Sequence, residues 1–340
     1  MNRPLRIVLP GGSGQVGRVL SRYFQERGHH VTVLTRLPYA ETWQTVRWDG
    51  ETVGPWTDYL EGADVCINLA GRSVNCRYHA ANRAAIYESR IRSTRLLGEV
   101  IGALSDPPKV WLNASTATIY RHALDRPMDE ATGELGGEPP HGRGPVRGDP
   151  GDEMLTAHRR APKSWNFSIR VAKDWEAAFF GAQTPSTRKV AMRSAITFSP
   201  VAGNAFAALL TLVRFGLGGK QGNGRQFVSW IHELDFARAV EFLIYRDDIA
   251  GVVNVASPNP LPNREFMAAL REAAGIPNGF PAPAPLIELG AVFLRTESEL
   301  VLKSRRVVPG RLLESGFEFE FPAWPEAAED LVYRWKHRFD

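Results

Sequence analysis

The first forty residues alternate between short apolar runs and one amphipathic stretch. An apolar run at 5–10 is followed at once by a glycine-rich segment at 11–17. From Val16 to Arg27 the apolar residues recur at the three- and four-residue spacing of a helix, and a second apolar run at 30–36 follows Gly28. This order predicts strand, glycine turn, helix and strand, which is the βαβ unit that binds a dinucleotide.

The glycine-rich segment has the spacing that a dinucleotide turn needs. Glycines at 11, 14 and 17 allow a tight turn, close approach of the backbone to a pyrophosphate, and close packing of helix on strand. The helix N-terminus beside them offers free N–H groups and a partial positive charge. A bare connection can also be glycine-rich, but here a strand precedes the turn and a helix follows it. The residues that we expect to contact the cofactor here are Gly11, Gly12, Ser13, Gly14, Gln15, Val16 and Gly17.

The end of the second predicted strand indicates which dinucleotide binds. An acidic residue there would accept hydrogen bonds from the ribose 2′-OH of NAD, whereas an arginine pairs with the 2′-phosphate of NADP. This chain has Thr35 and Arg36, with no acid until Glu41. Residues 1–47 hold seven arginines and two acids, so the local field favours an anionic ligand. We expect NADP(H), with its 2′-phosphate near Arg36; the alternative is that Arg36 is a solvated charge at a strand end.

Two later strand ends predict further cofactor contacts. The run from Thr45 to Asp49 is a third strand, and Asp49 at its end either bonds the adenine amino group or begins a turn. A clearer strand begins at Asp64, and its end should lie at the carboxyl edge of the sheet, where open α/β sheets bind ligands. The small residues that would let the ribose and phosphates pass over this edge are Asn68, Leu69, Ala70 and Gly71.

Apolar runs continue to alternate with helical stretches up to about residue 200. This alternation predicts an α/β fold, a doubly wound parallel sheet with helices on both faces, over residues 1–200. Residues 201–340 should form a smaller C-terminal α/β lobe. Residues 133–151 contain seven glycines and four prolines, which cannot continue a helix or a central strand. We therefore predict a long excursion at 121–164, either a flap over the active site or a mobile insertion.

Composition narrows the class of protein. No run of about eighteen apolar residues exists, so we expect no membrane partner. The first strand begins by residue 5, and the two cysteines, Cys66 and Cys76, lack metal-ligand spacing, so we expect a cytoplasmic location and no metal. The net charge of +4 is modest and no basic stripe interleaves with aromatics, so we expect no nucleic-acid partner. The one basic cluster outside the cofactor region is Lys303, Arg305, Arg306 and Arg311.

Beyond the glycine turn, several motifs resemble the epimerase-like, atypical branch of the short-chain dehydrogenase/reductases, a branch in which some members are described as cell-division inhibitors. The resemblance covers nearly the whole chain. Its most specific parts are the glycine-rich segment 215–219 and the run 222–232 that follows it. The other matching motifs are Ile67–Gly71, Ser89–Arg90, Asp174–Glu176, Arg193–Ser194, Val253–Pro260, Arg306–Pro309 and Gly316–Phe317.

The resemblance implies a Rossmann fold that binds NADP and a C-terminal lobe that closes over a small-molecule substrate. Members of the family are described by analogy with sugar-nucleotide epimerases, and the family's own reaction is unsettled. The positions that match cofactor contacts in such relatives are Thr35, Arg36, Leu69, Ala70, Arg90 and Thr197. We add Asn68, Gly71 and Ser115 at the strand ends, and Lys173, whose amine could reach a ribose hydroxyl.

The chain departs from the wider superfamily where chemistry is concerned. Those enzymes use a Ser or Thr at the end of the fifth strand, which Thr116 matches, and a Tyr-x-x-x-Lys pair on the next helix. Lys173 would need a tyrosine at 169, which is Ile169, and the alternative register gives Ser168 and Ala172. Neither register restores the pair.

Two interpretations follow from the missing pair. Either another group moves the proton, with Tyr120 and His232 as candidates, or the protein binds NADPH without turnover as a redox sensor or scaffold. Both side chains also have structural interpretations: Tyr120 packed under a loop, and His232 satisfied at a strand end.

The glycine-rich lobe segment supplies the expected substrate contacts. Dense glycines before a strand let the backbone approach a ligand, and Arg225 beside them could anchor a phosphate or carboxylate. The alternative is a plain hairpin with a solvated arginine. We expect a small carbonyl or sugar-nucleotide substrate in a cavity lined by Thr116, Tyr120, Arg225, Trp230 and His232.

Overall fold

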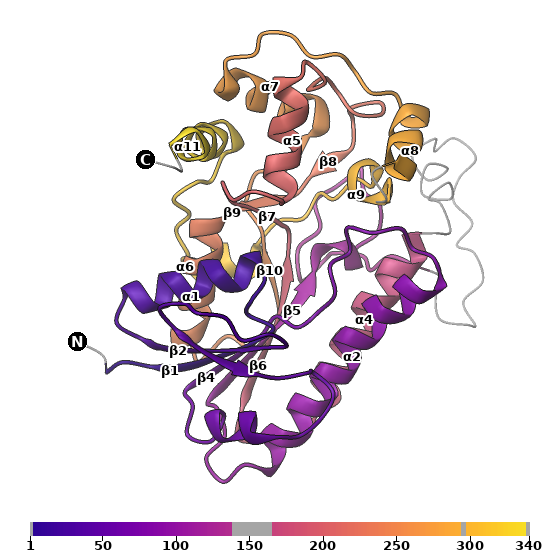
Figure 1. The fold of residues 1–340 in the computed structure, drawn as a ribbon. Helices are drawn as coiled ribbons and strands as arrows, with labels where there is room; N and C mark the ends of the chain where they lie inside the picture. The colour runs from indigo at the N-terminus through magenta and orange to yellow at the C-terminus, as the bar shows by residue number, and fades with distance from the viewer. Residues whose placement is uncertain (1–2, 138–164, 294–296, 338–340) are drawn as a thin grey trace.

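The computed structural model describes residues 3–137, 165–293 and 297–337 (Figure 1). The second part of the predicted excursion, 138–164, lies outside the described residues. Within the described ranges, no helix has both the length and the apolar character that crossing a membrane requires.

Seven parallel strands form the central sheet, which confirms the predicted doubly wound α/β fold. Their order across the sheet is β10-β6-β5-β4-β1-β2-β3. The strands are β1 (Arg6–Pro10), β2 (His30–Thr35), β3 (Gln44–Arg47), β4 (Val65–Asn68), β5 (Val110–Thr116), β6 (Arg188–Ser194) and β10 (Gly251–Val255). The order reverses between β1 and β4, and such a switch point opens a crevice at the carboxyl ends of the strands.

Helices cover both faces of the sheet, so its inner strands are largely buried, whereas no residue of the edge strand β3 is buried. On one face, α1 (Gln15–Glu26) packs beside α6 (Glu233–Tyr245), and the Tyr23 hydroxyl donates to Glu241 at 2.6 Å. On the other face, α2 (Ala80–Ala103) packs along α4 (Trp165–Gly181), as Figure 1 shows. Short 3₁₀ helices connect other elements: η1 (Pro55–Tyr59) and η2 (Ala117–Ile119).

Part of the chain beyond residue 200 belongs to this sheet. Strand β10 pairs with β6 in register from Gly251 to Val255, and α6 covers the sheet beside α1. The division at residue 200 stays a prediction. The structure adds that the chain leaves the central sheet after β6 and returns to it at β10.

The remaining C-terminal elements form a lobe above the carboxyl ends of the strands (Figure 1). Its core is aromatic: Phe266 stacks on Trp324 with ring centroids 4.1 Å apart, and Phe198 packs against both rings. The helices of this part are α5 (Ala205–Arg214), α7 (Asn263–Ala274), α8 (Ala284–Phe293), α9 (Glu299–Leu302) and α11 (Trp324–Lys336), whereas α10 (Gly310–Glu314) packs on β10 of the sheet. Its strand pairs are β7 (Ile196–Phe198) with β9 (Trp230–His232) and β8 (Phe227–Val228) with β11 (Leu261–Pro262).

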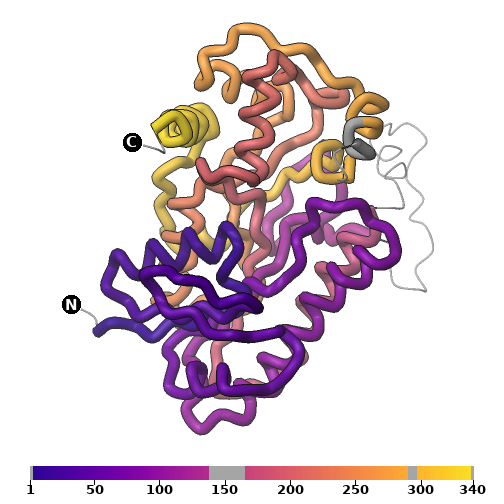
Figure 2. The backbone as a smooth tube through the Cα atoms, in the orientation of Figure 1, coloured from indigo at the N-terminus to yellow at the C-terminus, as the bar shows by residue number. Residues whose placement is uncertain are grey.

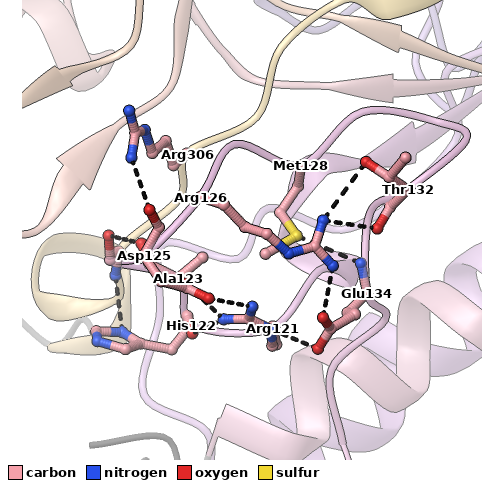
Figure 3. A network of polar contacts seen from close by, with 10 residues as sticks. Arg121, His122, Ala123, Asp125, Arg126, Met128, Thr132, Glu134 and Arg306 are labelled. Atoms are coloured by element: carbon pink, nitrogen blue, oxygen red, sulfur yellow. Dashed lines mark hydrogen bonds and ion pairs between the residues drawn. The ribbon is translucent and has the colours of Figure 1, made fainter. Parts of the chain in front are cut away.

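The described start of the predicted excursion, 121–137, is held by ion pairs. Arg121 contacts Asp125 and Glu134 at 2.7 Å each, and Glu134 also pairs with Arg126 (Figure 3). Arg306 from the C-terminal segment donates to the Asp125 carbonyl at 3.2 Å. The C-terminal segment around Arg306 thus runs from the lobe back to the sheet beside residues 121–137, and the tube in Figure 2 follows this path.

Candidate functional site

Three glycines of the turn between β1 and α1 are required by packing, and one is not. Gly11 has a φ of +75°, and a Cβ there would lie 2.6 Å from the Ala70 Cα. A Cβ at Gly12 would lie 2.9 Å from Leu9, and one at Gly17 would lie 2.2 Å from the Gly12 oxygen. Gly14 has an ordinary φ of −73° and open space where its Cβ would be. The fold therefore does not need glycine at 14, and the bare position leaves the N-terminus of α1 accessible.

The first residues of α1 face the lobe as well as the turn. Gly14 caps the helix with no side chain, so no protein group covers its first N–H groups by capping. The Gln15 amide nitrogen Nε2 donates to the Thr197 carbonyl at 3.3 Å. This bond brings Thr197, expected at the cofactor, beside the glycine turn.

The end of β2 carries a free cation. Thr35 is buried and its hydroxyl lies 3.5 Å from the Leu37 carbonyl, whereas Arg36 is exposed. Among the described residues, Arg36 makes no hydrogen bond or ion pair. The nearby Arg18 is already engaged, because it pairs with Glu41 at 3.4 Å and stacks over Tyr39. Arg36 is thus the arginine at this strand end whose guanidinium is available to an anion.

Asp49, the expected adenine contact, organises its own turn. Its carboxylate accepts hydrogen bonds from the amides of Glu51 and Thr52, at 2.8 and 2.9 Å, and from the Thr52 hydroxyl at 2.6 Å. The bond from the Thr52 hydroxyl is the largest of the effects that hold the pKa of Asp49 below its usual range. These contacts match the turn-initiating alternative.

The end of β4 is shaped by a buried amide. Asn68 lies in register with Asn113 of β5; its Nδ2 donates to the Asn113 oxygen at 2.7 Å and its Oδ1 accepts from the Ala70 amide at 3.0 Å. These bonds hold Leu69 and Ala70 where their backbone packs on Gly11. Asn68 therefore positions the edge of the expected cofactor path, with its own side chain buried.

Arg90 of α2 lies beneath the turn that ends β4. A Cβ at Gly71 would lie 3.1 Å from its Cζ, and the guanidinium donates to the carbonyls of Arg72 and Ile86. It also lies 5.1 Å from the centre of the Trp175 ring. No described carboxylate pairs with Arg90, and burial lowers its pKa to about 10.

Thr116 ends β5 with a hydroxyl that can still donate. Its Oγ1 accepts from the Thr118 amide at 3.1 Å, which leaves the hydroxyl proton unused among the described contacts. The side chain is half-buried. Its neighbour Ser115 faces the other way and donates to Glu176 Oε1 at 2.6 Å. Thr116 can therefore donate to a ligand oxygen, whereas Ser115 is committed to the protein.

Ser115 belongs to a buried group that we call the arginine network: Ser115, Tyr120, Glu176, Arg193 and Asn254. Ser115, Arg193 and Asn254 are register partners on the adjacent strands β5, β6 and β10. Arg193 donates to both oxygens of Glu176, at 2.8 and 2.7 Å. The sequence motifs contain Glu176 and Asn254, but nothing in their spacing singles them out.

Tyr120, one of the two candidate proton donors, is part of this network. Its hydroxyl donates to Asn254 Oδ1 at 2.9 Å and accepts from Arg193 Nη1 at 3.0 Å. The side chain is 2% exposed, and burial raises its pKa above the usual range. Both hydrogen-bonding positions of this phenol are occupied within the protein.

His232, the other candidate, joins α6, which covers the sheet, to α11 of the lobe. Its Nδ1 accepts from the Leu234 amide at 3.1 Å, so Nε2 carries the proton and donates to Asp330 at 3.0 Å. Trp230 is fully enclosed and packs on Trp324 with ring centroids 5.0 Å apart. The expectation that these two side chains line a cavity gains no support, because Trp230 packs within the aromatic core of the lobe and both ring nitrogens of His232 are bonded within the protein. Arg225, in contrast, is exposed and its side chain has no described partner.

The positions of the missing Tyr-x-x-x-Lys pair lie on α4. Ile169 is buried against Gly136, and Lys173 is half-buried with no described hydrogen bond. Ser168, of the alternative register, donates to Glu299 Oε2 at 2.8 Å.

Two residues of the basic cluster predicted from the sequence are buried: Lys303 is 2% exposed and Arg305 is 8% exposed. The sequence offered no signal for this burial.

Comparison with known proteins agrees with this geometry. Residues 7–256 match the NAD dependent epimerase/dehydratase family, and residues 282–331 match a domain of unknown function, DUF1731. The epimerase family protein SDR39U1 of Mus musculus is 30% identical over 336 residues, covering 96% of this chain and all of that protein. Its counterpart in Bos taurus is 29% identical over 334 residues with the same coverage.

A solved structure extends the similarity to three dimensions. The crystal structure of human epimerase family protein SDR39U1 (isoform 2) with NADPH has a TM-score of 0.78 and 27% identity to this chain, covering 96% of it and 99% of that chain. These similarities confirm the resemblance to the epimerase-like branch. Because the family match spans most of the 340 residues, the chain belongs to the NAD-dependent epimerase/dehydratase family.

Proposed function

We propose that this protein binds NADP(H) and uses it on a small carbonyl or sugar-nucleotide substrate. Gly14 is the observation that carries the proposal. Its φ is ordinary and nothing packs where its Cβ would be, so a glycine there serves an approaching ligand rather than the fold. The human relative crystallised with NADPH supports the same cofactor.

The residues present fit this cofactor. The turn 11–17 at the N-terminus of α1 would hold the pyrophosphate, and the exposed guanidinium of Arg36, which has no described partner, would bind the 2′-phosphate. Leu69 and Ala70 form the part of the carboxyl edge of the sheet over which the ribose would pass. The remaining cofactor-side residues of the proposal are Thr35, Asn68, Gly71, Arg90, Lys173 and Thr197, whereas Ser115 is left out because its hydroxyl is bonded to Glu176.

The cofactor supplies a hydride donor or acceptor, and Thr116 acts on the substrate. Its hydroxyl ends β5 and keeps its proton free, so it donates a hydrogen bond to the substrate oxygen and holds the carbonyl in place. Tyr120 and His232 have both hydrogen-bonding positions occupied, which favours positioning roles for them. Arg225 remains the proposed anchor for the outer part of the substrate.

A non-catalytic NADPH sensor or scaffold is the second candidate. The observation that favours it is the absence of a phenol on α4, where Ile169 occupies the tyrosine position. Screening NADPH oxidation against carbonyl and sugar-nucleotide libraries separates the two candidates. Turnover of any library member supports the enzyme, and NADPH binding without turnover supports the sensor.

Cofactor titration tests the proposal directly. Fluorescence titration of the wild type should give clearly tighter binding of NADPH than of NADH. Arg36→Ala should weaken NADPH by about 1–3 kcal/mol, the range for hydrogen bonds to charged groups, and leave NADH unchanged. Arg22→Ala is the matched control, because Arg22 is an exposed arginine on α1 with no described partner. Equal affinities for both cofactors, unaltered by Arg36→Ala, would reject the NADP(H) assignment.

A further inference from the structure

Three cations are linked electrostatically between the C-terminal segment and the Rossmann unit, two of them through Tyr78 and the third through Arg305. We call Arg90, Lys303 and Arg305 the cationic cluster. Arg90 comes from α2, whereas Lys303 and Arg305 follow α9. Tyr78 is buried beside them, and its charge state is coupled electrostatically to those of Arg90 and Arg305. The cluster therefore joins residues more than two hundred positions apart in the chain.

The cluster holds more positive charge than the described residues neutralise. Among them, Glu299 is the one carboxylate that acts on Lys303, and it also acts on Arg305. Its Oε1 is buried without a hydrogen-bond partner, and Lys303 Nζ lies 3.6 Å away, beyond hydrogen-bond distance. Buried charge without a counter-charge is costly, so a protein retains it chiefly where a function needs it.

The cations also keep unused hydrogen-bond donors. The Lys303 ammonium donates to the Thr118 carbonyl at 2.8 Å, which is one bond for three N–H groups. Arg305 Nε donates to Thr118 Oγ1 at 3.2 Å, and its Nη1 lies 3.4 Å from three backbone carbonyls. Its Nη2 has no partner among the described residues. Spare donors on adjacent cations are suited to an anionic oxygen.

The cluster borders the proposed reaction site. Thr118, which both Lys303 and Arg305 contact, donates its amide to Thr116 Oγ1 at 3.1 Å. Ser168 of α4 bonds Glu299 from the opposite side at 2.8 Å. Arg90 lies under Gly71, along the proposed cofactor path. Within the cationic cluster, Lys303 and Arg305 are consequently the two members left for a substrate.

We propose that Lys303 and Arg305 form a binding site for an anionic group of the substrate, a phosphate or a carboxylate carried close to its carbonyl. The inference rests on the proposed function, because it assumes that Thr116 holds the carbonyl. It narrows the substrate class to negatively charged carbonyl compounds. The C-terminal segment then contributes directly to substrate recognition.

The site has a pH dependence that identifies it. Burial and the neighbouring Arg305 lower the pKa of Lys303 to about 7, and Glu299 opposes the shift. An anion that binds Lys303 favours the ammonium, so binding should weaken as the pH rises above 7, by up to about tenfold per unit. Besides Arg90, the third member of the cluster, the charged or titratable groups around it are Cys76, Arg77, Tyr78, His122 and Glu297.

Sulfate is the probe, because it does not titrate in this range. The full chain is saturated with NADPH, so that the glycine turn is filled, and sulfate-dependent stabilisation is measured between pH 6.5 and 9 with sodium chloride keeping the ionic strength constant. The wild type should respond most strongly at low pH. Lys303→Met should lose most of the response, and Lys303→Arg should keep a response that no longer changes with pH. Acetate in a parallel arm distinguishes a preference for planar carboxylates from one for tetrahedral anions.

Lys189→Met is the matched control. Lys189 also has a lowered pKa, caused by burial, but it bonds only backbone carbonyls at the end of α4. Its substitution should leave the sulfate response unchanged. A response equal in wild type, Lys303→Met and Lys303→Arg, or equal to that of chloride, would overturn the inference. NADPH binding is measured separately by fluorescence, so failure of cofactor binding is distinguishable from failure of the anion site.

Discussion

The arginine network and the cationic cluster flank the same turn after β5, but they differ in charge balance. In the arginine network, one guanidinium meets one carboxylate, and Tyr120, Ser115 and Asn254 bond the groups that remain. Burial is the largest single influence on Arg193 and opposes its charge, but the hydrogen bonds and charge interactions with Glu176 and Tyr120 together outweigh burial and raise the pKa of Arg193. In the cationic cluster, burial prevails and lowers the pKa values of Lys303 and Arg305.

This difference separates two uses of buried charge. A satisfied, balanced network fixes one arrangement of β5, β6, β10 and α4, and it has no spare group for a ligand. An unbalanced cluster lowers the stability of the free protein and gains when an anion arrives. We therefore assign the arginine network to the fold and the cationic cluster to binding.

Breaking the balanced network should have the largest effect on stability. Arg193→Leu leaves Glu176 buried without its partner, so we expect unfolding free energy to fall by about 3–5 kcal/mol. Denaturant unfolding measures this. Arg246→Leu is the control, because Arg246 makes a similar paired contact with Asp248 at the surface, where solvent screens the charges, and its loss should change stability far less. Equal losses in the two variants would show that the network contributes no more than a surface pair.

The contrast also explains which parts of the site could be predicted from sequence. The glycine turn was predictable because its requirements are local: Gly11 to Gly17 lie within one strand-turn-helix unit, and Arg36 ends the next strand. The parallel sheet was predictable from alternating apolar runs. The cofactor assignment rested on the same local features.

The arginine network and the cationic cluster depend on contacts that no local pattern encodes. Ser115, Arg193 and Asn254 become neighbours only through strand register, and Tyr120 lies 134 positions from Asn254. Lys303 and Thr118 lie 185 positions apart. In the sequence, Lys303 was one member of a basic cluster, with nothing to indicate that it would be buried. Trp230 and His232 are likewise enclosed by contacts that no local pattern encodes, which is why the sequence alone placed them at a ligand.

Removing a cation from the cationic cluster should raise stability, whereas breaking the arginine network should lower it. The pKa of Lys303 is about 7 in the folded protein, against an ordinary value of 10.5. Between pH 7 and pH 10.5, the unfolded chain therefore binds more protons than the folded protein does. Wild-type stability should therefore rise with pH across this window, by up to about 1.4 kcal/mol per unit from this residue. Lys303→Met should be more stable than wild type at pH 7, and the difference should shrink as the pH approaches 10.

Urea unfolding of both proteins at several pH values measures this difference. The subtraction isolates residue 303, because every other titrating group is common to the two chains. A difference that does not change with pH would mean that Lys303 stays fully charged when buried. The cationic cluster would then not differ from the arginine network in how its buried charge affects stability.

The smallest effect should come from removing one hydroxyl of the balanced network. Tyr120→Phe leaves Arg193 Nη1 and Asn254 Oδ1 without a partner, so we expect a loss of about 1–2 kcal/mol. NADPH affinity should stay within about twofold, and turnover of any substrate found should fall by less than tenfold. Tyr23→Phe, which removes a buried hydroxyl bonded to Glu241 on the far face of the sheet, is the control for stability. Loss of a general acid typically costs 10²–10⁴-fold, so a fall of that size with folding and cofactor affinity intact would make Tyr120 the proton donor. That result would move the arginine network from the fold to the chemistry, because Arg193 would then be the cation that stabilises a phenolate.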